Sequence, residues 1–145
     1  MSELLLEASA AMRGLHSLTV SFGTGSTPDP QSVLAYQSKI VSIHERLGQE
    51  MARKFGAKER AYLNRKIQEA KQYQHGRIEL KKTASDSSKD AILAVGDELD
   101  KEIESAQEYE SYRLMLQSLE RAFQHSIQVV SLLKTSESSS SKSND

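Results

Sequence analysis

The sequence predicts an all-α protein built on a long antiparallel helical hairpin, coiled-coil-like, with a short N-terminal helix. Two observations predict this fold. Apolar residues recur at intervals of three or four through most of the 145 residues, which is the spacing of a helical stripe. The two prolines and three of the seven glycines, Gly23, Gly25 and Gly76, fall between or beside these stripes, where they favour helix ends. A hydrophobic fraction of 37% is enough for an elongated helical core but thin for a globular one.

The N-terminal segment, residues 1–28, predicts a short amphipathic helix followed by a flexible connector. The helix covers the first eighteen residues, and its apolar face is formed by Leu5, Ala8, Met12 and Leu15. The connector runs from Phe22 to Pro30 and contains Gly23-Thr-Gly25, which we interpret as a hinge because no strand or lysine accompanies it as in a phosphate-binding loop. The short helix would dock on the hairpin or on a neighbouring subunit.

The hairpin domain, residues 29–134, begins with a long helix from about residue 30 to 75. Asp29 is placed as its N-cap and Pro30 as its first helical residue. The apolar stripe keeps its phase from Val33 onward, and the helix is expected to end near Gly76. Gly56 lies within this stripe, so a break there is the alternative to one continuous helix.

A second long helix is expected after a polar turn at residues 83–88. Ser87 and Asp90 give a weak capping signal for its start. Its apolar stripe runs from Ile92 to Leu133 with a mean spacing of about 3.4 residues, which is typical of coiled coils. The serine-rich tail, residues 135–145, has little apolar surface to bury and is expected to be disordered.

Several classes of function find no support in the composition. The chain has no cysteine, which excludes disulfides and thiolate metal sites and fits a cytoplasmic protein. No apolar run approaches the roughly 18 residues that a membrane-spanning helix needs. The four histidines lack the spacing of a zinc site, and the carboxylates lack a companion nucleophile. We therefore expect no enzyme activity, no cofactor and no bound metal.

Charge is segregated along the hairpin although the net charge is only −1. Residues 53–82 hold ten Lys or Arg against three Glu, a net charge of +7. Residues 83–121 hold ten acids against four bases, a net charge of −6. One interpretation is that the two blocks pair across the hairpin and fix its register. The other is that the basic block binds a polyanion.

A helical wheel of residues 53–73 separates cations from apolar side chains. One arc holds Phe55, Tyr62, Leu63, Ile67, Ala70 and Tyr73, which we expect to pack inward. The opposite arc holds Arg53, Lys54, Lys58, Arg60, Arg65 and Lys71, spaced to follow several phosphates of a nucleic-acid strand. Tyr62 and Tyr73 lie near the border, where a ring packs inward or faces an unstacked base; we favour the core for both.

Two stretches resemble the phage recombination mediators of the T4 UvsY type. The first is Leu34-Ala-Tyr36 with residues 40–50, and the second is Leu63-Asn-Arg-Lys-Ile67 leading to His75-Gly-Arg77. The family motif has leucine, lysine, alanine, arginine and leucine, then tyrosines and a glycine-arginine pair. Asn64 replaces a family lysine, and extra residues precede Gly76. The resemblance covers roughly residues 34–130.

That resemblance implies a non-enzymatic, oligomeric helical protein of DNA recombination and repair, located in the cytoplasm of a phage-infected host cell. It would bind single-stranded DNA without sequence preference and help load a strand-exchange recombinase in place of a single-strand-binding protein. The DNA-binding residues expected from the basic block and the resemblance are Arg53, Lys54, Lys58, Arg60, Arg65, Lys66, Lys71 and Arg77. The alternative is a protein-only coiled-coil module, such as a phage assembly or scaffold protein, that does not bind DNA.

Overall fold

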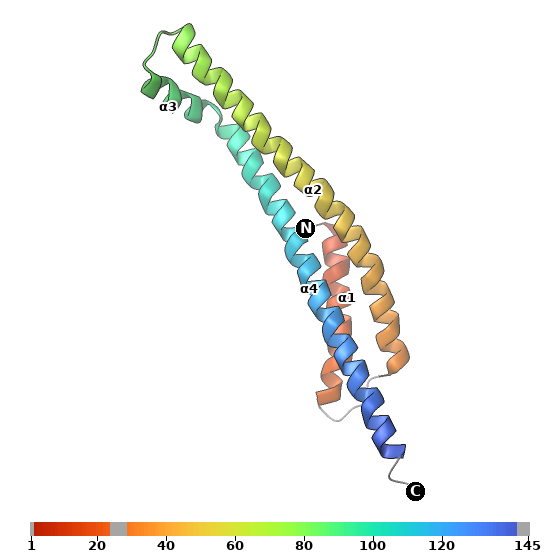
Figure 1. Cartoon of the computed structure of the whole chain (residues 1–145). Coiled ribbons are helices and arrows are strands. Elements are labelled where there is room, and N and C mark those ends of the chain that lie inside the picture. The colour runs from red at the N-terminus through yellow and green to blue at the C-terminus, as the bar shows by residue number, and fades with distance from the viewer. Residues whose placement is uncertain (1, 24–28, 142–145) are drawn as a thin grey trace. The chain divides into compact units, whose positions relative to one another are not determined.

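The structure, a computed structural model, describes residues 2–23 and 29–141. This part of the chain is all-α and has the helices α1 (Glu3–Gly23), α2 (Pro30–Ile78), α3 (Ala84–Ala94) and α4 (Gly96–Ser141) (Figure 1). The all-α prediction is confirmed, and the two long helices α2 and α4 pack against each other. Residues 24–28 of the predicted connector and residues 142–145 of the predicted tail lie outside the described residues. None of the described helices is long and apolar enough to cross a membrane.

Helix α2 confirms the single long helix predicted from residue 30, and it passes through Gly56 without a break. Its N-cap is Asp29, as predicted. The Asp29 carboxylate accepts hydrogen bonds from the backbone N–H groups of Gln31 and Ser32, both at 3.3 Å, and from the Ser32 hydroxyl at 2.7 Å. The Ser32 hydroxyl, followed by the Gln31 N–H, lowers the pKa of Asp29, because these donors stabilise the ionised carboxylate.

The second long helix differs from the prediction, because it is divided into α3 and α4. Val95 separates them, with φ −105° and ψ 26°, and Gly96 with its weak helix propensity follows. The predicted cap at Ser87 is also wrong. Thr83 is the N-cap: its hydroxyl accepts from the Asp86 N–H at 3.2 Å and donates to the Asp86 carboxylate at 2.8 Å. Ser87 and Asp90 have the same spacing as Thr83 and Asp86, but Ser87 lies inside α3, where its side chain packs on Gly76 of α2.

Two helices extend beyond their predicted ends. Helix α1 continues past residue 18 to Gly23, and α4 continues through the serine-rich stretch to Ser141. The disorder expected from Thr135 is therefore corrected for residues 135–141. Hydroxyls in this stretch donate to carbonyls one turn back, as from Thr135 to the Ser131 oxygen at 3.0 Å and from Ser139 to the Thr135 oxygen at 3.1 Å. These bonds satisfy the hydroxyl donors without interrupting the helix.

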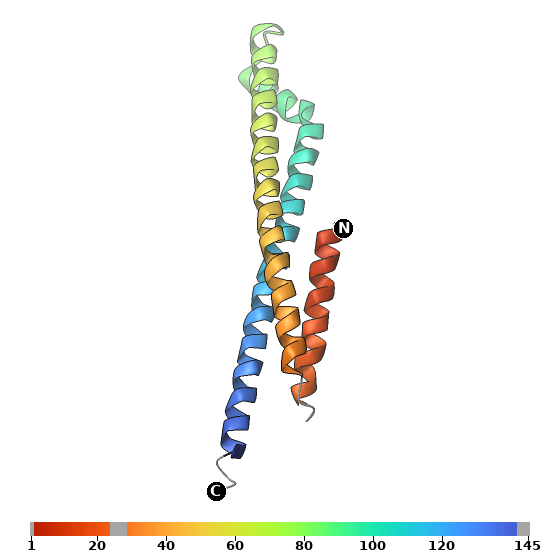
Figure 2. The same cartoon turned by 90° about the vertical axis from the view of Figure 1, so that its right-hand side faces the viewer.

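The chain forms two compact units, whose boundaries fall inside the long helices. Unit 1 comprises Met1–Gln49 and Tyr112–Asp145. Within it, α1 lies beside the first part of α2 and the later part of α4 (Figure 2). The Tyr112 hydroxyl donates to the Ser2 hydroxyl at 2.8 Å, and Arg46 pairs with Glu7 at 3.0 Å. The N-terminal helix thus belongs to the core of this unit.

The core of unit 1 follows a seven-residue repeat on both long helices. On α2 the repeat buries Val33, Ile40 and Leu47; on α4 it buries Tyr112, Leu119, Ser126 and Leu133. Ser126 is accommodated because its hydroxyl accepts from Gln37 at 2.8 Å and donates to the Phe123 carbonyl at 2.6 Å. The stripe predicted from Ile92 to Leu133 includes Ile127 and Val130 by spacing, whereas the buried residues at this point of α4 are Ser126 and Val129. This register is that of a coiled-coil seam.

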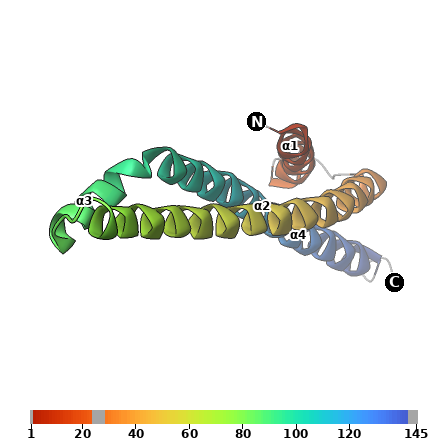
Figure 3. The same cartoon turned by 90° about the horizontal axis from the view of Figure 1, so that it is seen from above.

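Unit 2 comprises Glu50–Ser111 and contains the end of α2, all of α3 and the start of α4. Helix α3 connects the two long helices, which run antiparallel (Figure 3). Its described buried side chains are the small Ser87 and Ala91, and the C-cap residue Val95 after it is also buried. Ser87 packs on Gly76, where an added Cβ would lie 2.9 Å from the Ser87 hydroxyl oxygen. Small residues therefore allow α3 to approach α2 closely.

Much of the predicted apolar arc of α2 does not pack on α4, although Phe55 at its start contacts the Tyr109 ring of α4. Leu63 and Ile67 are 56% and 52% exposed, while Lys54 and Arg65 from the opposite arc make the cross-helix contacts described below. The expectation that the arc packs inward is corrected for these aliphatic residues. A two-helix unit gives each long helix one long neighbour, so much of a wide apolar arc stays exposed.

Candidate nucleic-acid interface

Two of the predicted DNA-binding residues turn toward α4 and hold the hairpin together. Lys54 Nζ lies 2.6 Å from a Glu108 carboxylate oxygen. The Arg65 guanidinium donates to Glu102 through Nε and to Glu69 through Nη1, the latter at 2.9 Å. The hydrogen bond that Arg65 donates to Glu102 raises the pKa of Arg65, with smaller contributions from the charges of Glu102 and Glu69. These two cations are occupied by carboxylates.

Lys58 is half-buried against two aromatic rings. Its ammonium lies 5.9 Å from the centre of the Phe55 ring and 5.2 Å from that of Tyr109. The two rings are 5.6 Å apart and inclined at 58°. Cation–π attraction therefore holds Lys58 between the helices, and a phosphate would have to compete with it.

Lys66 and Arg77 are exposed but have partners on their own side of the hairpin. Lys66 Nζ lies 3.7 Å from a Glu69 carboxylate oxygen, and Arg77 donates to the Lys82 carbonyl at 3.0 Å. The bond from Arg77 reaches into the turn after α2, where Lys81 has the left-handed φ of 51°. Arg77 thus stabilises the turn.

Arg53, Arg60 and Lys71 remain the most accessible predicted cations. Arg53 is 77% exposed and pairs with Glu50 on its own helix at 2.6 Å. Arg60 and Lys71 are exposed, and neither has a carboxylate within ion-pair distance in the ranges that the structure describes. Helical phase places these three cations along one flank of α2, about a third of a turn from Lys54 and Arg65.

The tyrosines at the border of the two arcs are half-exposed. Tyr62 is 41% and Tyr73 38% exposed, so the core positions favoured from the sequence are corrected to surface positions. The Arg65 guanidinium carbon lies 5.6 Å from the centre of the Tyr62 ring. By helical phase both rings lie nearly half a turn around α2 from Arg53, Arg60 and Lys71, so they are accessible on a different face from these three cations.

A hollow on α2 lies between Arg53 and Arg60. Its volume is about 350 Å³, and its lining comprises Glu50, Ala52, Arg53, Lys54, Gly56, Ala57 and Arg60. The small residues form its floor, and a Cβ added to Gly56 would meet only the Arg60 Nη1 atom, at 3.7 Å. In the sequence, Gly56 among basic residues is the signal that corresponds to this hollow, besides its effect on helix continuity.

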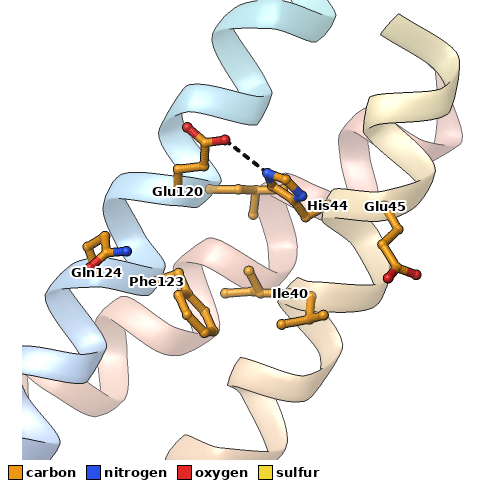
Figure 4. Close-up of a pocket in the computed structure, with 8 residues that line it drawn as sticks. Ile40, His44, Glu45, Glu120, Phe123 and Gln124 are labelled. Atoms are coloured by element: carbon orange, nitrogen blue, oxygen red, sulfur yellow. Dashed lines mark hydrogen bonds and ion pairs between the residues drawn. The ribbon is translucent and has the colours of Figure 1, made fainter. Parts of the chain in front are cut away.

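A second hollow, in unit 1, is apolar and was not foreseen from the sequence (Figure 4). Its volume is about 290 Å³, and its apolar walls are Ile40, Val41, Leu119 and Phe123. At one edge His44 Nε2 lies 3.0 Å from a Glu120 carboxylate oxygen, linking α2 to α4. The described residues contain no group of acidic, histidine or cysteine side chains able to hold a metal ion.

Comparison with family models, curated proteins and solved structures finds no match to this chain. The arrangement of charge on α2 therefore carries the functional argument, together with the sequence resemblance described above.

Proposed function

We propose that this protein is a recombination mediator that binds single-stranded DNA non-specifically and helps load a strand-exchange recombinase. The observation that carries the proposal is the open cationic flank of α2 formed by Arg53, Arg60 and Lys71. The acidic side chains that neutralise the basic block lie largely against Lys54 and Arg65, so they leave this flank positive. The recombinase and the displaced single-strand-binding protein are proposed as partners because of the resemblance to phage mediators.

The mechanism would be structural, with no bond made or broken. Cations along α2 replace counterions on successive phosphates, and counterion release supplies the binding free energy. Several protomers in one assembly would hold the strand extended, so that each contact raises the effective concentration of the next. A recombinase would then nucleate on the extended strand.

Self-association is part of the proposal, and the exposed apolar residues of unit 2 support it. Besides Leu63 and Ile67 on α2, Leu99 and Ile103 on α4 are also exposed. Apolar side chains left open along two adjacent helices favour burial against a further protein surface. A second copy of the same chain would supply that surface and would place several cationic flanks in one particle.

The central test is a salt titration of binding to a fluorescent single-stranded oligonucleotide. Each phosphate contact contributes a slope of about −0.7 in log affinity against log salt, so three contacts per protomer predict a slope near −2. Affinity should be similar for different base sequences of the same length. A flat salt dependence would reject the proposal.

The protein-only coiled-coil module is the second candidate, and the Lys54–Glu108 and Arg65–Glu102 pairs favour it. These pairs account for part of the charge segregation without DNA. Charge reversal of Arg60 and Lys71 to Glu separates the two functions, because neither residue takes part in a cross-helix pair. If the variant loses DNA binding and keeps the mass of the assembly in light scattering, the mediator is supported. If the variant assembly dissociates and the unmodified protein does not bind DNA, the coiled-coil module is supported.

A further inference from the structure

Gly56 is a glycine that the fold of the single chain does not require. It lies inside the continuous helix α2, where glycine is about 1 kcal/mol less favourable than alanine. A Cβ at Gly14 would clash with the Tyr36 ring, so close packing explains that glycine. A Cβ at Gly56 would meet only Arg60 Nη1, at an ordinary van der Waals distance of 3.7 Å. The missing side chain of Gly56 therefore leaves space at the helix surface and is not needed to avoid a clash.

The space above Gly56 is bounded by guanidinium groups. Arg53 and Arg60 lie about two helical turns apart, roughly 10 Å along the axis. Arg60 extends over Gly56 and has no carboxylate partner within the described ranges. Arg53 donates to Glu50 at 2.6 Å through Nη1, which leaves further N–H donors of its planar fork available. Ala52 and Ala57 also line the hollow, and their short side chains do not fill it.

We infer that this hollow is a seat for one phosphodiester group of the bound strand, held chiefly by Arg60 and secondarily by Arg53. A guanidinium fork matches two phosphate oxygens, and bidentate charge-assisted bonds of this kind are stronger than neutral ones. The Glu50 carboxylate opposes an anion at one end of the hollow, so the phosphate lies toward Gly56 and Arg60. The inference rests on the proposed function, because it assigns one contact of the same DNA-binding flank.

The experiment fills the hollow without changing charge. Gly56→Leu places a side chain where the phosphate would lie, and we expect about tenfold weaker binding to a single-stranded oligothymidylate, since one bidentate charge-assisted contact is lost. The magnitude of the salt slope should fall by about 0.7, the contribution of one phosphate contact. Gly56→Ala adds only a methyl group and should bind almost as the unmodified protein does.

Gly48→Leu is the matched control, because Gly48 lies on the same helix and a Cβ there would meet nothing within 4 Å. It should leave DNA affinity unchanged. Circular dichroism and light scattering would verify that both leucine variants keep their helix content and mass. A second pair is independent of the glycine: Arg60→Lys keeps the charge but loses the fork and should weaken binding several-fold, whereas Lys71→Arg should not.

The outcomes distinguish failure of the proposed phosphate site at Gly56 from failure of the proposed DNA-binding function. Steep, salt-dependent binding that is unaffected by Gly56→Leu and Arg60→Lys overturns the seat and leaves the mediator proposal standing. Equal losses in Gly56→Leu and Gly48→Leu also overturn it, because the effect would then belong to the helix. A loss of mass in Gly56→Leu alone would assign the hollow to a carboxylate of a second copy. Absence of any DNA binding by the unmodified protein rejects the function and the seat together.

Discussion

The two compact units use the same helices and the same seven-residue repeat, but they place opposite kinds of side chain on it. In unit 1 the repeat on α2 is Val33, Ile40 and Leu47, all buried. Continued into unit 2, the same positions are Lys54, Ala61 and Gln68, all half-buried. One helix thus carries an aliphatic seam in one unit and a largely polar seam in the other.

The change of seam has a structural consequence in each unit. Unit 1 gains its stability from apolar burial among three helices. Unit 2 joins its helices through ion pairs, cation–π contacts and small residues, and its leucine and isoleucine side chains remain exposed. Unit 1 is therefore held together chiefly by its apolar seam, and unit 2 is the part that carries the DNA-binding flank of the proposed function.

The largest expected effect is a truncation in the seam of unit 1. Leu119 is completely buried, so Leu119→Ala should lower the free energy of unfolding by about 2–5 kcal/mol through lost burial and a residual cavity. Leu63→Ala in unit 2 should lower it by less than about 1 kcal/mol in the dissociated protein, because Leu63 is already half-exposed. Urea denaturation followed by circular dichroism at low protein concentration measures both. Equal losses would contradict the division of roles.

A smaller effect is expected where a glycine permits close contact. Gly14→Ala would place a methyl group against the Tyr36 ring and should lower the free energy of unfolding by about 1–3 kcal/mol. Gly48→Ala meets no atom and should raise it by up to about 1 kcal/mol through better helix propensity. Opposite shifts of the thermal midpoint are the expected result, and a stabilised Gly14→Ala would show that α1 does not pack on α2 as described.

Substituting leucine for polar residues in the seam of unit 2 would make it resemble the aliphatic seam of unit 1. Gln68 and Ser105 are half-buried repeat positions on α2 and α4, and leucine at either should raise the free energy of unfolding by about 1 kcal/mol. Denaturation of the single and double variants would measure this gain. A loss of stability instead would mean that polar groups at these positions are needed for the fold itself.

The smallest effect concerns the cap of α2. The pKa of Asp29 is lowered in the folded protein, so its charge stabilises the fold above the unfolded value near 3.8, and this contribution is lost as pH falls through the lowered folded pKa. Asp29→Ala should therefore lower the thermal midpoint slightly at neutral pH. The gap between variant and unmodified protein should narrow at a pH below that folded value; a constant gap would exclude an ionised cap.

The sequence predicted the helical class, the course of α2 and its Asp29 cap, because period and capping are local properties of the chain. It missed the break at Val95, because one apolar stripe continues in phase from Ile92 to Leu99 on both sides of it. It also could not show which arc of α2 meets α4. That depends on pairing between residues far apart in sequence, such as Arg65 with Glu102.

The sequence predicted which cations form the candidate site, but not which partners each of them has in the structure. All eight proposed contacts lie in unit 2, but composition does not distinguish Lys54, held by Glu108, from Lys71, which is open. The hollow at Gly56 could not be predicted from the sequence either, because it depends on where the Arg60 side chain lies. Local pattern identifies a basic helix, whereas the three-dimensional partners decide which of its charges are available.

Because α2 runs through both units as one unbroken helix, its backbone amides should exchange with deuterium at two different rates. Amides near Ile40 open only when an apolar seam opens, whereas those near Ile67 are protected by a polar one. Although α2 is one continuous helix, its amide exchange would then be slow in unit 1 and fast in unit 2. Binding of single-stranded DNA would slow the exchange of the amides in unit 2 only.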